Sequence, residues 1–175
     1  MDLREKKTKR SIYNAFLHLR TKKPLERISV KELCELAEIS KATFYLHYRD
    51  IYDLSETLQL NIIKDILGYL SSPGKLLEDP VRANNEILSG FYANGSIVSI
   101  LFGDSQFSRL PECINSEIKN TLFREHPELK NDIQANVRIT FQIMGGFYVY
   151  HEYNRQFGHE NVSSAISKLL ELFEE

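Results

Sequence analysis

The sequence predicts an all-α protein. Apolar residues recur every three or four positions along most of the 175 residues, which is the spacing of one face of an α-helix. No run of useful length alternates apolar and polar residues, so β-strands are not expected. Turn-forming residues gather at few places, above all in the Ser-Ser-Pro-Gly segment at 71–74. We therefore expect two helical domains, residues 1–50 and residues 51–175.

Two helices are expected first. Thr8 is a candidate cap for the first helix. Ser29 begins the second, and Glu32 follows three residues later, which is the spacing of a capping box. The two apolar faces consist of Ile12, Ala15, Phe16 and Leu19 in the first helix and Val30, Leu33, Cys34 and Ala37 in the second.

A third helix follows after a short turn. Ser40 is the next capping residue, and only Glu38 and Ile39 separate it from the second helix, so the chain must turn sharply there. At about 100° per residue, Phe44 and Tyr48 lie within roughly 40° of each other and point back into the domain. The residues left for the other side and its edges are Lys41, Ala42, Thr43, Tyr45, Leu46 and His47.

The exposed side of this third helix suits the major groove of double-stranded DNA. The groove accepts one α-helix and offers hydrogen-bonding base edges and the thymine methyl group. Ala42 and Leu46, four residues apart, suit methyl contacts, which predicts a half-site that contains thymine. Lys41 and Tyr45 lie where phosphate contacts are expected.

Several short motifs between residues 8 and 54 occur together and in order. They are Lys23-Pro24, Ile28-Ser29-Val30, Glu35-Leu36-Ala37 and Thr43-Phe44-Tyr45-Leu46-His47-Tyr48. With these motifs the chain resembles the DNA-binding domain of the tetracycline-repressor (TetR) family. The resemblance implies a three-helix helix-turn-helix domain in residues 1–50 and a helical effector-binding and dimerisation domain in residues 51–175.

The resemblance also assigns roles to residues. It implies that Thr43, Tyr45 and His47 contact DNA, and that Ser40 and Lys41 lie near the DNA backbone. Together with the groove argument, the candidate DNA-binding residues are Ser40, Lys41, Ala42, Thr43, Tyr45, Leu46 and His47.

The chain departs from the family pattern at two positions. Glu38 stands where the family usually has glycine in the turn, and a left-handed conformation at this glutamate costs roughly 1 kcal/mol. Ile51 replaces a lysine that commonly opens the fourth helix and binds a phosphate. Tyr52, beside it, is a candidate neutral substitute.

Charge is divided unevenly along the chain. Up to Asp53 there are twelve Lys and Arg against eight Asp and Glu, a net charge of +4, whereas the remainder has ten against sixteen, a net charge of -6. The positive end is the expected DNA end. Its first ten residues carry Arg4, Lys6, Lys7, Lys9 and Arg10, which form either a tail that reaches phosphates or a solvated tail without a role.

The carboxyl-terminal two thirds is helical in pattern. A helix from about Ile51, with Asp50 as its cap, should end at 71–74, and a loop should continue to Pro80. Gly158 is expected to stop a long helix. The further expected helices cover about 81–93, 96–102, 111–124, 131–156 and a segment after Asn161.

The last two helices are the expected dimerisation element, because the family pairs them with those of a second subunit as a four-helix bundle. Gly145 and Gly146 each cost about 1 kcal/mol inside a helix. Close approach of another helix would compensate for them, and a simple kink is the alternative. Two reading heads about 34 to 36 Å apart would recognise a palindromic operator.

The family resemblance also implies a small-molecule effector, whose identity the sequence does not reveal. Residues that could line an aromatic pocket for it, or form plain core, are Phe91, Tyr92, Phe102, Phe107, Phe141, Met144, Tyr148 and Tyr150. We take Phe102, Phe107, Phe141, Met144 and Tyr148 as the pocket candidates.

No catalytic, cofactor or metal site is expected. His151-Glu152 lacks the second histidine of a zinc-binding His-Glu-x-x-His motif, because Arg155 occupies that position. Cys34 and Cys113 offer no disulfide framework, and no signal peptide or membrane-spanning run is found, so a cytoplasmic protein is expected.

The sequence thus predicts a sequence-specific DNA-binding transcriptional regulator, a homodimeric repressor that a small effector releases. The alternative is a protein-interaction adaptor that has the same fold and does not bind DNA. The replacements at Glu38 and Ile51 favour this alternative, whereas Thr43, Tyr45 and His47 argue against it.

Overall fold

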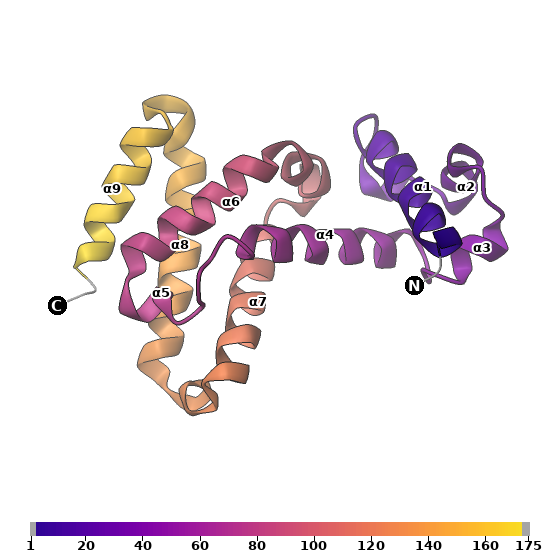
Figure 1. The fold of residues 1–175 in the computed structure, drawn as a ribbon. Coiled ribbons are helices and arrows are strands. Elements are labelled where there is room, and N and C mark those ends of the chain that lie inside the picture. Colours follow the sequence, from indigo (N-terminus) through magenta and orange to yellow (C-terminus); the bar gives the residue numbers. More distant parts are fainter. Residues whose placement is uncertain (1–2, 173–175) are drawn as a thin grey trace. The chain divides into compact units, whose positions relative to one another are not determined.

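The computed structural model describes residues 3–172, apart from the side chain of Asp104, and these residues form helices joined by turns (Figure 1). No β-strand occurs in this part of the chain, so the predicted all-α class is confirmed. None of the helices described is long and apolar enough to cross a lipid bilayer.

The order of the elements is as follows. The α-helices are α1 (Leu3–Arg20), α2 (Val30–Ala37), α3 (Lys41–Tyr45), α4 (Ile51–Leu67), α5 (Lys75–Glu78), α6 (Pro80–Leu101), α7 (Arg109–Glu125), α8 (Ile133–Phe157) and α9 (His159–Glu171). Short 3-10 helices are η1 (Leu25–Arg27), η2 (Asp104–Gln106) and η3 (Pro127–Asn131).

The chain divides into two compact units. Unit 1 consists of Met1–Ile62 and Ser96–Phe107, and unit 2 consists of Ile63–Gly95 and Ser108–Glu175. The boundary expected after residue 50 falls inside unit 1. Two helices, α4 and α6, contribute residues to both units.

In unit 1, α1 packs against α2, and α2 packs against α3. The side chains of Phe16, Leu33, Phe44 and Leu54 are wholly buried and form its centre. The expected cap at Thr8 is wrong, because α1 begins at Leu3 and the Thr8 hydroxyl donates a hydrogen bond to the Arg4 carbonyl, 3.0 Å away, within the helix. The basic residues near the amino terminus therefore belong to a helix rather than to a tail.

Side chains cap two helices of unit 1 as expected, with one difference. The Ser29 hydroxyl accepts a hydrogen bond from the Glu32 amide at 3.2 Å, and the Asp50 carboxylate accepts one from the Asp53 amide at 2.8 Å. The return half of the predicted capping box is absent in this structure. The Glu32 carboxylate instead forms an ion pair with the Lys23 ammonium group.

The segment 96–107 is tied to the rest of unit 1 by polar contacts. Arg20, nearly buried, donates hydrogen bonds to the carbonyls of Lys23 and Gly103, at 3.2 and 3.5 Å. The Gln59 amide donates to the Leu101 carbonyl at 3.0 Å. Phe102, which stands between Leu101 and Gly103 in the sequence, is buried. The end of α6 is therefore part of the core of unit 1.

In unit 2, α8 packs against both α7 and α9 (Figure 1). The buried residues Val162, Ile166 and Leu170 of α9 form an apolar cluster, with Val149 and Tyr150 packed against it. Gly158, at φ 81°, ends α8 as predicted. The last helix begins at His159, which is slightly earlier than expected.

The helix α6 corrects the expectation of two separate helices at 81–93 and 96–102. It is continuous from Pro80 to Leu101. The Asn94 side chain donates a hydrogen bond to the Gly90 carbonyl at 2.9 Å, so it bonds back along the helix instead of ending it. Gly95 keeps the helical conformation, and its side-chain position is open space.

Gly90 marks a close crossing of two helices within unit 2. A Cβ atom at this position would lie 2.5 Å from the carbonyl oxygen of Ile66 in α4. This is a steric clash that only a movement of the backbone could relieve. A glycine is therefore required where α6 meets the end of α4.

We expect Gly90→Ala and Gly95→Ala to have opposite effects on stability. Gly90→Ala should lower the free energy of unfolding by about 1–3 kcal/mol, because it forces the two helices apart. Gly95→Ala, in the same helix, should raise it by roughly 0.5–1 kcal/mol, because alanine favours the helix and meets no neighbour. Urea unfolding followed by circular dichroism measures both, and similar effects of the two variants would contradict the close crossing.

Candidate nucleic-acid interface

A left-handed residue forms the turn between α2 and α3. Glu38 has φ 54° and ψ 44°, and it is the non-glycine residue with positive φ within the described chain. The amide of Ile39 donates a hydrogen bond of 3.0 Å to the carbonyl of Cys34, five residues earlier, which is the pattern of a Schellman motif. The expected left-handed conformation at Glu38 is confirmed, although glutamate is not favoured there.

The helix α3 is short and begins at a well-formed cap. The Ser40 hydroxyl accepts a hydrogen bond from the Thr43 amide at 3.0 Å, and the two hydroxyl oxygens lie 2.9 Å apart. The helix ends at Tyr45, so Leu46 and His47 extend from the turn that follows it. Hydrogen bonds to the Phe44 carbonyl from the amides of His47 (2.9 Å) and Tyr48 (3.0 Å) hold this turn.

Two aromatic side chains anchor α3 in the core of unit 1. Phe44 is 0% exposed and Tyr48 is 9% exposed, and their ring centroids lie 5.8 Å apart. Burial raises the pKa of Tyr48, with nearby Lys9 opposing the shift, so the phenol is neutral at physiological pH. These are the residues that the sequence pattern predicts to point inward.

The candidate DNA-binding residues all reach the surface of unit 1. Leu46 is 82% exposed and Tyr45 is 56% exposed, although both are large and largely apolar. Thr43 and His47 are half-buried, and the remaining three candidates, Ser40, Lys41 and Ala42, are exposed. Because Phe44 lies between Thr43 and Tyr45 in sequence, its burial places these neighbours about 100° to either side of the buried face, where Thr43 is half-buried and Tyr45 is exposed.

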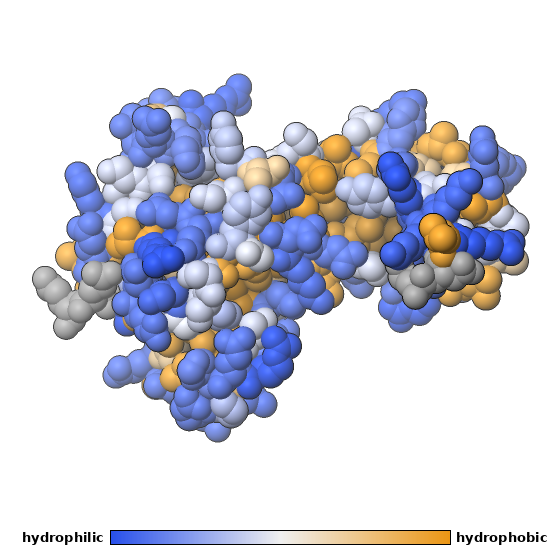
Figure 2. All heavy atoms as spheres, in the orientation of Figure 1, coloured by the Kyte–Doolittle hydropathy of each residue, from blue (hydrophilic) through white to orange (hydrophobic). Residues whose placement is uncertain are grey.

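The amino-terminal end of α1 lies beside α3 (Figure 1). Lys9 and Glu5 form an ion pair at 2.8 Å, which lowers the pKa of Glu5, and His47 is close enough to add to that shift. Lys6 and Lys7 are exposed on the same helical turns. In Figure 2 this end of unit 1 carries several strongly hydrophilic side chains. The turns of α1 that bring Glu5 close to His47 thus also carry two exposed lysines.

Two residues around the start of α4, Arg49 and Asp53, form an ion pair that sequence reasoning missed. The Arg49 guanidinium lies 2.9 Å from the Asp53 carboxylate, its side chain is 82% exposed, and this contact lowers the pKa of Asp53. A local signal was present, because the two residues are four apart at the start of a helix. Ile51 is buried, whereas Tyr52 is half exposed.

The structure divides the five effector-pocket candidates between the units. Phe102 and Phe107 belong to unit 1, whereas Phe141, Met144 and Tyr148 belong to unit 2. Phe102 is buried, and Phe141 and Tyr148 are exposed on α8. The five residues therefore do not line one cavity within either unit.

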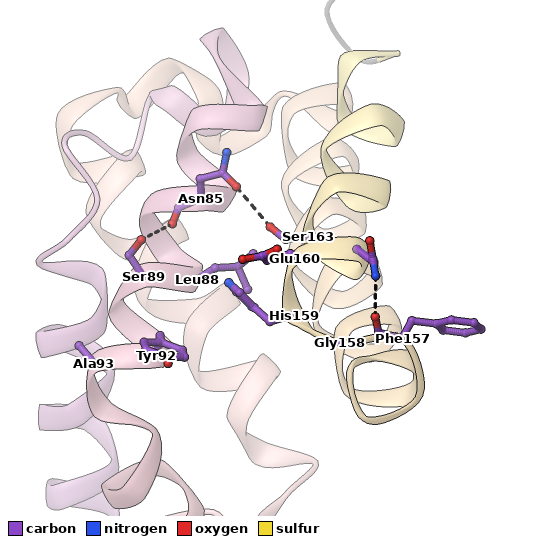
Figure 3. A pocket seen from close by; sticks show the side chains of 11 residues that line it. Asn85, Leu88, Ser89, Tyr92, Ala93, Phe157, Gly158, His159, Glu160 and Ser163 are labelled. Carbon is purple, nitrogen blue, oxygen red and sulfur yellow. Dashed lines mark hydrogen bonds between the residues drawn. The ribbon is translucent and has the colours of Figure 1, made fainter.

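A pocket of about 720 Å³ lies elsewhere in unit 2, between α6 and the turn from α8 to α9 (Figure 3). Of the eight residues that the sequence offered as pocket or core candidates, Tyr92 lines it. Sequence reasoning missed the polar lining residues Asn85, His159 and Glu160. Their spacing carries no local signal, because α6 and α9 come together only in the folded chain.

The residues that the structure describes contain no group of three or more His, Cys, Asp or Glu that could hold a metal ion. Comparison with models of known protein families, with curated proteins and with solved structures finds no match to this chain.

The turn before α3 makes a testable prediction. Glu38→Gly should raise the free energy of unfolding by about 1 kcal/mol, because glycine adopts the left-handed conformation without steric cost. Glu35→Gly, the same change in the last turn of α2, should lower it by about 1 kcal/mol. Thermal unfolding of both variants checks this, and a destabilised Glu38→Gly protein would contradict the strain assigned to the turn.

Proposed function

We propose that this protein is a sequence-specific DNA-binding transcriptional regulator, as its resemblance to the TetR family suggests. In this proposal α2 and α3 form a helix-turn-helix, and residues 40–47 contact the operator. The protein acts as a homodimer, and a small effector controls DNA binding. The observation that carries the proposal is a wholly buried Phe44 that is followed directly by the exposed Tyr45 and Leu46.

The exposed surface of α3 supports contact with bases rather than with protein core. The Leu46 side chain is 82% exposed, so burying it against another apolar group is favourable. The methyl group of thymine in the major groove is such a group. Thr43 and His47 offer hydrogen-bonding groups beside Leu46. Lys41 and the lysines of α1 supply positive charge for phosphates.

An apolar face on α8 supports the homodimer. It consists of Ile133, Val137, Phe141, Met144 and Tyr148, which fall within about 80° of one another at helical spacing. Val137 and Phe141 are 60% and 63% exposed. Soluble proteins rarely expose such a contiguous apolar surface unless a partner covers it.

Gly145 lies next to this apolar face of α8. A Cβ atom there would meet no other atom within 4 Å, so the packing inside the chain does not require a glycine. Close approach of a helix from a second copy would explain it. On α9, Leu169 is also exposed, and it extends the surface available to a four-helix bundle.

DNA binding is tested by selecting bound sequences from a random double-stranded pool. We expect a palindromic product whose half-sites contain thymine. Tyr45→Ala, at a position suited to a phosphate contact, and His47→Ala, at a position suited to a base contact, should each weaken binding to that product by about tenfold, because one such hydrogen bond contributes roughly 1–3 kcal/mol. Gel-shift titration at a fixed salt concentration measures the loss.

The matched controls are Tyr69→Ala and His18→Ala, which remove an exposed tyrosine and an exposed histidine away from α3. Both should bind like the unchanged protein. A pool that yields no enriched sequence, with equal and sequence-indifferent binding by all five proteins, would reject the regulator and leave the adaptor as the better account.

The homodimer is tested separately by light scattering after size exclusion. Phe141→Glu and Leu169→Glu should each shift the protein toward a 20.4 kDa monomer, because a buried unpaired carboxylate strongly opposes association. Leu60→Glu, at another exposed apolar position, should leave the mass unchanged. A dimer that survives both substitutions would show that α8 and α9 are not the interface.

A further inference from the structure

The pocket in unit 2 has walls from two separate parts of the chain (Figure 3). One wall is the middle of α6, with Asn85, Leu88 and Tyr92. The other is the start of α9, with His159, Glu160 and Ser163. The Asn85 and Ser163 side chains form a long hydrogen bond of 3.5 Å across one end of the pocket.

The size of the pocket fits a small organic molecule. Its volume of about 720 Å³ lies within the roughly 300–1,000 Å³ of typical ligand sites. In Figure 3 the side chains of His159 and Glu160 extend from α9 toward α6, whereas Phe157 points away from α6. The groups that reach into the space are therefore aromatic and polar.

Aromatic rings line one end of the pocket. The Tyr92 ring lies 5.9 Å from the His159 ring, at an interplanar angle of 36°. The Tyr150 hydroxyl is hydrogen-bonded to His159 Nδ1 at 2.9 Å, and this bond fixes the imidazole. Tyr92 is 80% exposed, so much of its ring remains accessible to a ligand.

The charge of the lining is one-sided. Glu160 is the carboxylate among the lining residues, and neither lysine nor arginine lines the pocket. No ion pair of Glu160 occurs within the described residues. Its place in the first turn of α9 favours a negative charge by itself. Its side chain extends from α9 toward α6 (Figure 3), so the carboxylate is accessible to a cation in the pocket.

We propose that this pocket binds a small organic ammonium ion that carries an aromatic or other apolar group, with the cation at Glu160 and the apolar group against Tyr92 and His159. The inference rests on the proposed function to the extent that this ligand is the effector of the regulator. Exposed carboxylates attract ammonium groups, and the face of a tyrosine ring attracts both cations and flat apolar groups. An organic anion would meet the Glu160 carboxylate and no compensating basic side chain.

The test compares three probes of similar shape and different charge. They are 2-phenylethylammonium, the neutral 2-phenylethanol and the anion 3-phenylpropionate, each titrated into the 175-residue protein and followed by NMR chemical shifts. We expect the ammonium probe to bind most tightly and to shift resonances of residues 85–93 and 157–163. Equal binding of the three probes, or tighter binding of the anion, overturns the proposal.

Variants identify the groups that bind the ammonium probe. Glu160→Gln and Tyr92→Leu should each weaken its binding by roughly fivefold, in line with a partly exposed charge pair and a cation–π contact. The controls are Glu152→Gln and Tyr153→Leu, which make the same changes on α8 outside the pocket and should have no effect. All four positions are exposed, so the folded state should persist, and circular dichroism checks it.

The outcome is separable from the outcome for DNA binding, because the probe titration uses no DNA. Loss of selective probe binding with an intact gel shift rejects the pocket alone. Selective probe binding without any sequence preference on DNA rejects the regulator and leaves a ligand-binding protein. Equal probe affinity of Glu160→Gln and the unchanged protein overturns the role of the carboxylate.

Discussion

The burial of Phe44 is the constraint on which the candidate interface depends. A helix of five residues has too few internal hydrogen bonds to be stable alone, so α3 exists because its one buried side chain, Phe44, is fixed in the core of unit 1. The Ser40 cap and the left-handed Glu38 set where the helix begins. Once Phe44 points inward, the positions of Thr43, Tyr45 and Leu46 follow from helical geometry.

Unit 1 is completed by residues distant in sequence. The end of α6 and the segment to Phe107 belong to it, and Arg20 and Gln59 donate hydrogen bonds to carbonyls of this segment. The same helix carries Tyr92, which lines the pocket of unit 2. One uninterrupted helix thus contains both the residues proposed to meet a ligand and residues that build the core of the proposed DNA-binding unit.

The helix α8 has two faces with different environments. Its inner face, with Ile139 and Ile143, is buried against the other helices of unit 2. Its outer face, with Val137 and Phe141, is as apolar but remains exposed. Burial within one chain accounts for the apolar residues of the inner face. Burial against a second copy, in the proposed homodimer, would account for those of the outer face.

Local features were determined by the sequence alone. Helical periodicity predicted the all-α class, and the caps at Ser40 and Asp50, the stop at Gly158 and the left-handed Glu38 followed from interactions within a few residues. Other features depend on tertiary contacts. They are the continuity of α6, the ion pair of Glu32 with Lys23, the division of the effector-pocket candidates between two units, and the meeting of Tyr92 with His159 and Glu160. Packing between segments far apart in the chain fixes these contacts, and the spacing of residues along the chain does not encode that packing.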